Sequence, residues 1–157
     1  MSLENEFKFL LSAGSDLEEV VFGLDPRIIR QGYLHTGSDS TVRVRIIDDV
    51  VGKLTVKGPA NLNTRSEYEY EIPVVDAEHI LAMCSATISK KRYVKNVDGY
   101  DYEIDVYDGY DNLTTVELEY TEEGQLPVEW PSFIGEDVST NPKYKNHSLA
   151  LSQSRRQ

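Results

Sequence analysis

The chain has 157 residues, a length typical of one domain around a single hydrophobic core, so we expect one domain over residues 1–157. It carries 16 Lys and Arg against 27 Asp and Glu, a net charge of −11, which argues against a broad basic surface for a nucleic-acid duplex or an anionic membrane. No apolar run approaches the roughly 18 residues of a membrane-spanning helix, and the N-terminus lacks a secretory pattern. We therefore expect a cytoplasmic protein. Because Cys84 is the only cysteine, an internal disulfide and a cysteine-based zinc site are excluded.

The predicted secondary structure is dominated by strands rich in Val, Ile and Tyr, which are separated by short turn segments. In chain order the predicted strands are 3–11, 28–35, 41–47, 51–58, 65–73, 87–96, 100–107 and 112–121. Short turns favour antiparallel neighbours. Short helices are predicted at 16–24, where residues 15–18 resemble a capping box, at 76–84 after Asp76, and at 146–152. The predicted fold class is mainly β, with a few short flanking helices.

Charged and apolar residues alternate along at least seven of these eight segments, so one face of each strand is charged. Acidic residues cluster on the first, fifth, seventh and eighth strands, and basic residues cluster on the third, fourth and sixth. A half-buried sheet with a solvated outer face explains any single strand. If the sheet instead curls so that the charged face lines a lumen, the basic strands form an anion-binding cradle and the acidic strands offer carboxylates to Mg²⁺ or Mn²⁺.

An ordered set of motifs along nearly the whole chain resembles the CYTH domain family, also called triphosphate tunnel metalloenzymes. The motifs are ENEFK at 4–8, IRQGYL at 29–34, VRVR at 42–45, LTVK at 54–57, RSEYE at 65–69, KKRY at 90–93, EIDV at 103–106, ELE at 117–119, GEDVS at 135–139 and PKYKN at 142–146. Asp137 and Ser139 are conservative departures from the family's usual residues, and they lie outside the charged strands. The resemblance implies an eight-stranded antiparallel β-barrel that forms a charged tunnel.

The resemblance also implies roles for individual residues. Lys8 and Tyr33 would act as a catalytic pair near the scissile phosphoryl group. Phosphate oxygens would be held by five basic residues, which are Arg43, Arg45, Lys57, Lys90 and Arg92. Mg²⁺ or Mn²⁺ would be held by Glu4, Glu6, Glu117 and Glu119, and a second, less defined set of acids comprises Asp105, Glu67 and Glu69. Because no histidine shares a spacing with another ligand, we interpret His35, His79 and His147 as structural or surface residues.

The function that the resemblance implies is metal-dependent hydrolysis of a small-molecule triphosphate, foremost inorganic tripolyphosphate to pyrophosphate and phosphate. The alternatives are a class IV-type adenylate cyclase, a nucleoside or thiamine triphosphatase, and a polyphosphate- or nucleotide-binding module without turnover. A monomer and a homodimer are both compatible with the sequence. Phosphoryl transfer asks a protein chiefly for positioning and for well-placed positive charge, which the alternating strands supply.

Overall fold

The computed structural model describes residues 2–59, 64–111, 113–120 and 124–156, and among these the side chains of residues 2–4, 64 and 153–156 lie outside the description. The strands are β1 (Ser2–Leu11), β2 (Arg27–Thr36), β3 (Thr41–Ile47), β4 (Val51–Lys57), β5 (Thr64–Ile72), β6 (Ala86–Val97), β7 (Tyr100–Tyr107), β8 (Thr114–Glu119) and β9 (Ile134–Asp137). The helices are α1 (Leu17–Val20), α2 (Val74–Met83), the 3₁₀ turn η1 (Pro142–Tyr144) and α3 (Asn146–Arg156).

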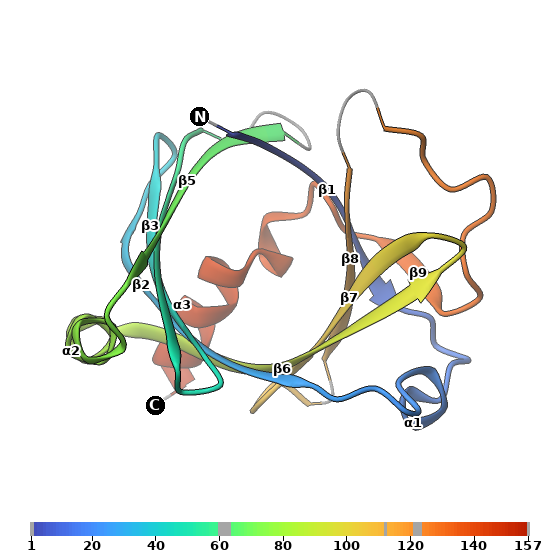
Figure 1. The fold of residues 1–157 in the computed structure, drawn as a ribbon, viewed down its shortest axis with the longest axis horizontal. Coiled ribbons are helices and arrows are strands. Elements are labelled where there is room, and N and C mark those ends of the chain that lie inside the picture. The colour runs from blue at the N-terminus through green and yellow to red at the C-terminus, as the bar shows by residue number, and fades with distance from the viewer. Residues whose placement is uncertain (1, 60–63, 112, 121–123, 157) are drawn as a thin grey trace.

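The strands form one antiparallel sheet in the order β5-β4-β3-β2-β6-β7-β8-β1-β9. In addition, Ser2–Asn5 of β1 pairs with Thr64–Glu67 of β5. The ladder of eight strands therefore returns to its starting strand and surrounds a central space (Figure 1). The predicted mainly β fold with eight ring-forming antiparallel strands is confirmed.

The structure differs from the sequence predictions at several element ends. Strand β9 was not predicted, because its four residues are too few to show a period-2 pattern. The helix predicted at 16–24 is helical only over α1, and its cap is the Asp16 carboxylate, which accepts a hydrogen bond from the Glu18 amide. Helix α2 begins two residues earlier than predicted, directly after Pro73. Helix α3 continues beyond residue 152. Within the described ranges, no helix is both long enough and apolar enough to cross a membrane.

The apolar faces of the strands point outward and pack under the flanking segments. Val44 and Ile46 of β3 are buried against Ala77 of α2. On the other side of the ring, a larger apolar cluster joins the outer faces of β1, β7 and β8 to Phe133 and to residues of α1. These outer layers keep the curved sheet in place, since apolar burial is favourable only on the face that they cover.

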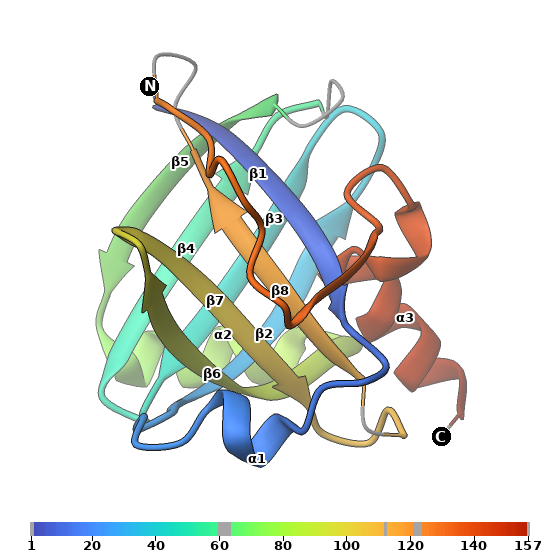
Figure 2. The same ribbon diagram turned by 90° about the vertical axis from the view of Figure 1, so that its right-hand side faces the viewer.

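One end of the ring is covered by α3 (Figures 1 and 2). There the inward-facing positions become apolar or aromatic, and Leu149 and Ala150 of α3 are buried among Tyr33, Ile88 and Tyr107. We call this the closed end of the tunnel. The charged side chains lie between it and the opposite, open mouth.

Candidate active site

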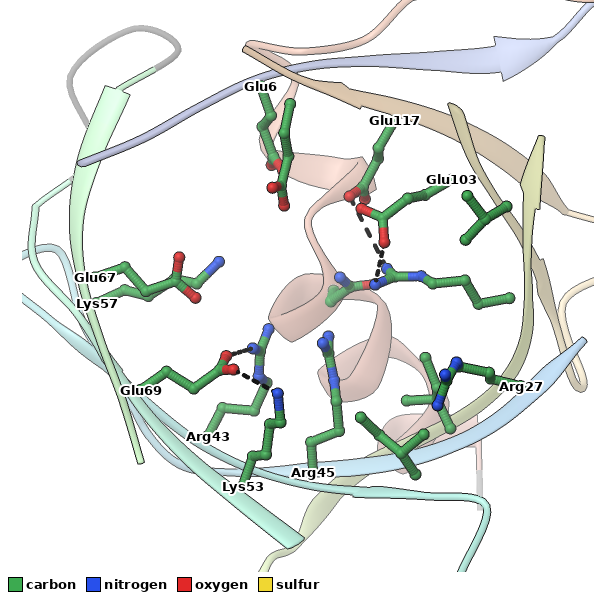
Figure 3. A pocket seen from close by; sticks show the side chains of 16 residues that line it. Glu6, Arg27, Arg43, Arg45, Lys53, Lys57, Glu67, Glu69, Glu103 and Glu117 are labelled. Atoms are coloured by element: carbon green, nitrogen blue, oxygen red, sulfur yellow. Dashed lines mark hydrogen bonds and ion pairs between the residues drawn. The ribbon is translucent and has the colours of Figure 1, made fainter. Parts of the chain in front are cut away.

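The charged faces of the strands line a cavity of about 620 Å³ inside the ring (Figure 3). The solvated-face alternative is therefore wrong for these strands. The charged residues in its wall are Glu6, Arg27, Arg43, Arg45, Lys53, Lys57, Glu67, Glu69, Arg92, Glu103, Glu117 and Glu119. Nine of them belong to the predicted site. They come from β1, β3, β4, β5, β6 and β8 and lie up to 113 residues apart in the chain, from Glu6 to Glu119.

A basic wall is formed by β3 and β4. Arg43 and Arg45 are two residues apart and extend into the cavity (Figure 3). Gln31, fully buried on β2, accepts a hydrogen bond from Arg45 Nε (2.9 Å) through its amide oxygen and donates one from its amide nitrogen to the Tyr33 hydroxyl (2.8 Å). Burial, together with the charges of Arg43 and Arg92, lowers the pKa of Arg45 to about 10, so it stays cationic at neutral pH. The guanidinium charge of Arg45 in the cavity wall can therefore attract a bound anion.

A buried network occupies the wall made by β6 and β7. Lys90 Nζ lies 2.7 Å from Asp105 Oδ2, and both side chains are fully buried. Arg92 donates two hydrogen bonds to Asp105, from Nε (2.7 Å) and Nη2 (2.8 Å), and its Nη1 lies 2.9 Å from Glu103. Burial raises the pKa of Asp105, but Lys90 and Arg92 outweigh it and hold that pKa far below its ordinary value. Arg92 reaches the cavity, whereas Lys90 and Asp105 act from behind its surface.

Lys8 and Glu117 form the neighbouring ion pair, with Nζ and Oε1 3.4 Å apart and both side chains almost completely buried. The residues are direct partners in the β1–β8 register. Although burial raises the pKa of Glu117, Lys8 and Arg92 outweigh it and lower that pKa to about 2. Conversely, burial lowers the pKa of Lys8, but Tyr107 and Glu117 raise it above its ordinary value. Lys8 is thus a permanent cation, suited to stabilising negative charge rather than to accepting a proton.

The predicted metal ligands lie along β1 and β8. Glu6 is the direct partner of Glu119, and Glu117 is two residues away on the same face. Like charges placed directly opposite each other disfavour strand pairing, and a divalent cation relieves that repulsion. The carboxylate donors therefore fit a hard cation. Among the described residues, however, no three Asp, Glu, His or Cys side chains lie close enough together to form a metal-binding group. The side chain of Glu4 lies outside the description, so its predicted role stays a prediction.

On the opposite wall, Glu69 lies between two cations. Lys53 Nζ is 3.0 Å from Glu69 Oε1, and Arg43 Nη2 is 3.9 Å from Oε2 (Figure 3). Glu67 extends into the same cavity beside Lys57 (Figure 3). Burial raises the pKa of Glu69, but Lys53 and Arg43 lower it below its ordinary value. In this arrangement Glu69 balances the charges of Lys53 and Arg43, two cations that are also positioned to contact a bound phosphate.

The predicted pair Lys8 and Tyr33 lines a second, smaller cavity at the closed end. Tyr33 is buried, and its ring meets the ring of His147 edge-on with centroids 6.1 Å apart. The interpretation of His147 as structural or surface is thus incomplete, since His147 lies in the wall of this cavity. His35 and His79 are exposed, as expected.

Several residues that were not among the predicted site residues also face the tunnel. They are Arg27, Lys53 and Glu103 in the large cavity, Arg65 and Lys145 in the small one, and Gln31 behind Arg45. Strand alternation places Lys53, Arg65 and Glu103 on the charged face, because each lies an even number of residues from a predicted site residue on its own strand. No local pattern distinguishes Lys145, because its approach to the site depends on how the C-terminal segment crosses the end of the ring.

Comparison with known proteins agrees with this geometry: residues 2–142 match the CYTH domain. The chain belongs to the CYTH domain family. An inorganic triphosphatase of Acetivibrio thermocellus is 38% identical over 152 residues, covering 95% of this chain and 94% of that protein. An inorganic triphosphatase of Nitrosomonas europaea is 35% identical, covering 95% of this chain and 97% of that protein. A solved structure of an inorganic triphosphatase superimposes with a TM-score of 0.64 at 31% identity, covering 96% of each chain.

Proposed function

We propose that this CYTH domain protein hydrolyses inorganic tripolyphosphate to pyrophosphate and phosphate with the help of a divalent cation. The observation that carries the proposal is the convergence of Arg43, Arg45, Lys57 and Arg92 on one cavity that also contains carboxylates. Such a cavity offers positive charge to phosphate oxygens and oxygen ligands to a metal. The names of the two bacterial relatives support the same activity.

The residues that would hold Mg²⁺ or Mn²⁺ are Glu6, Glu117 and Glu119, with Glu4 as a further ligand. When bound, the metal supplies charge neutralisation between phosphate oxygens and makes a bound water easier to deprotonate. The second acidic set divides in its roles. Asp105 positions Arg92 through two hydrogen bonds, whereas Glu69 balances cations of the opposite wall, where Glu67 lies beside Lys57 (Figure 3).

The chain's own residues then bind and orient the substrate. Arg43, Arg45 and Arg92 hold non-bridging oxygens of the triphosphate, and Lys57 adds positive charge from β4. Lys8, kept cationic by Glu117, stabilises the negative charge that develops when the bridging P–O bond breaks. Tyr33, oriented by Gln31, forms the remaining wall at the closed end of the tunnel. The oxygen of the broken P–O bond stays with the pyrophosphate product, and water supplies the new oxygen of the phosphate product.

A second candidate is hydrolysis of an organic triphosphate such as a nucleoside or thiamine triphosphate. The specific observation in its favour is that Ile29, Ile47 and Val94 line one side of the large cavity beside Arg27. An apolar wall next to a guanidinium suits a planar organic group. The adenylate cyclase and the non-catalytic binding module remain outcomes of the same experiment.

Purified protein incubated with Mg²⁺ or Mn²⁺ tests these functions directly. The substrates are tripolyphosphate, ATP, thiamine triphosphate and pyrophosphate, with phosphate, pyrophosphate and cyclic AMP measured. We expect the highest kcat/KM for tripolyphosphate, and loss of turnover with excess EDTA. Cyclic AMP as the main product would identify a cyclase, and tight binding without any product would identify a binding module. Either result would refute the proposal.

A further inference from the structure

The smaller cavity at the closed end has a volume of about 60 Å³. It adjoins the large cavity, because Glu6, Arg43, Lys57 and Asn146 line both. The C-terminal segment covers its far side with Tyr144, Lys145 and His147. Since part of this wall lies beyond residue 142, it lies outside the range that matches the CYTH domain.

Positive charge is concentrated around this small volume. Its cationic lining residues are Lys8, Arg43, Lys57, Arg65 and Lys145, and they come from β1, β3, β4, β5 and the segment before α3. The acidic residue in the lining is Glu6. Burial and the charge of Arg65 lower the pKa of Lys145, which shows that these cations disfavour one another in the absence of an anion. An anion bound among them would remove that repulsion.

Two of these residues also have unused hydrogen-bond donors. Arg65 Nη2 donates to the Gly58 carbonyl oxygen (2.9 Å), and Arg43 Nη2 donates to Thr55 Oγ1 (3.3 Å). Their Nε atoms, however, are buried without a hydrogen-bond acceptor among the described residues. Buried polar groups are nearly always satisfied, so both guanidinium groups beside this cavity are incompletely hydrogen-bonded, and an anion bound next to them would supply acceptors.

The size of the cavity defines what that ligand is. A volume of about 60 Å³ has room for a few water molecules at roughly 10–15 Å³ each, so it suits one tetrahedral phosphoryl group better than a nucleoside or a whole triphosphate. The first turn of the 11-residue helix α3 also contributes Asn146 and His147, and helix N-termini favour anions. Burial lowers the pKa of His147, so its imidazole is neutral at pH 7 and adds a wall rather than another charge.

We propose that the closed-end cavity is a subsite for one terminal phosphoryl group of the substrate, and that Arg65 and Lys145 complete it. A terminal phosphoryl group has three non-bridging oxygens and more negative charge than an internal one, which matches a pocket with several cations and unused donors. The substrate then lies lengthwise, with one end under α3 and the remainder in the large cavity. This inference rests on the proposed triphosphatase function, but it concerns only where an end group binds.

Binding of inorganic phosphate in EDTA, measured by calorimetry, tests the subsite without turnover. Lys145→Met should weaken phosphate binding about tenfold, the typical effect of losing one charge-assisted contact. Arg65→Met should do the same, and Lys145→Met serves as the independent test if the loss of the Arg65–Gly58 bond impairs folding. The matched control is Lys91→Met, which removes the same charge from an exposed position on β6. Equal affinities of Lys145→Met and Lys91→Met, or no binding to the unmodified protein, would overturn the subsite.

A cyclic substrate analogue tests the requirement for an end group. Trimetaphosphate contains three phosphoryl groups but no terminal one. We therefore expect the unmodified protein to bind trimetaphosphate at least about tenfold more weakly than tripolyphosphate. That difference should shrink in Lys145→Met. Equal affinities of the unmodified protein for trimetaphosphate and tripolyphosphate would contradict binding through an end group.

The two proposals fail separately. If phosphate binding depends on Lys145 but no triphosphate is hydrolysed with Mg²⁺ or Mn²⁺, the proposed function is wrong and the anion subsite stands. If tripolyphosphate is hydrolysed but the affinity for phosphate is unchanged in Lys145→Met and Arg65→Met, the function stands and the subsite is wrong.

Discussion

Lys90 and Asp105 form an ion pair that is fully buried in the tunnel wall, with Nζ and Oδ2 2.7 Å apart. Asp105 at the same time accepts two hydrogen bonds from Arg92, a residue that lines the cavity. One carboxylate therefore neutralises a cation behind the wall and orients a second cation within the site.

We expect Asp105→Asn to lower the free energy of unfolding by about 3–5 kcal/mol, because it leaves two buried cations without their shared anion. Denaturation by guanidinium chloride measures this change. Asp101→Asn is the control, since Asp101 is exposed on the same strand and its replacement should alter stability by no more than about 0.5 kcal/mol. Similar stabilities of the two variants would contradict the role assigned to the buried pair.

Affinity for metal-free tripolyphosphate should fall as the pH rises through about 7. Burial, with the charges of Arg92 and Arg45, lowers the pKa of Lys90 to about 7, so the lysine is cationic below that pH and neutral above it. Losing one charge near the anion costs about 1 kcal/mol or more, roughly a fivefold change in affinity. Calorimetry in EDTA between pH 6 and 8 should show this change in the ratio of wild-type to Lys90→Met affinities, in which titration of the ligand cancels. A constant ratio would show that Lys90 does not titrate in this range.

Replacing Glu119 by Gln should raise the Mg²⁺ or Mn²⁺ concentration for half-maximal activity by about tenfold or more, because the change removes one of the proposed carboxylate ligands, the one opposite Glu6. Binding of tripolyphosphate in EDTA should be unchanged or tighter, since the cavity loses a negative charge. Metal titrations of activity and calorimetry measure the two effects. Glu136→Gln, an exposed acid on β9, is the control with the same charge change. An unchanged metal requirement in Glu119→Gln would remove Glu119 from the ligand set.

Lys8 and Arg43 should affect different kinetic constants. Arg43→Ala removes a proposed phosphate contact that would be present in both the ground and the transition state, so KM should rise about ten- to a hundredfold with little change in kcat. Lys8→Met should instead lower kcat by about that factor, because Lys8 stabilises charge that develops during bond cleavage. Steady-state kinetics on tripolyphosphate separate the two.

Lys8→Met leaves the buried Glu117 with one ion-pair partner in the described part of the chain, the more distant Arg92 at 4.0 Å. The melting temperature of the variant must therefore be measured in parallel. A wild-type kcat in a folded Lys8→Met variant would show that Lys8 is an ordinary binding residue.

The sequence determined where eight of the nine described strands lie and which residues of each of those strands share a face. Alternation of charged and apolar residues has the period of a strand, so Arg43 and Arg45, or Glu117 and Glu119, could be placed together without a structure. The alternation alone did not determine the direction in which the sheet curves, and only the family resemblance pointed to a tunnel. The same alternation describes a sheet with its charged face outward.

Only the tertiary structure decided that the charged face is enclosed, because that outcome depends on contacts between distant segments. Residues of β1 pair with β5 some 60 positions later in the chain, and α2 covers the apolar side of β3. It also decided the depth of each charge, placing Lys90 behind the cavity and Lys145 at its closed end. A period-2 pattern specifies the face of a residue but not its position along the tunnel, which is set by register, curvature and the packing of α3 on Tyr33 and Tyr107.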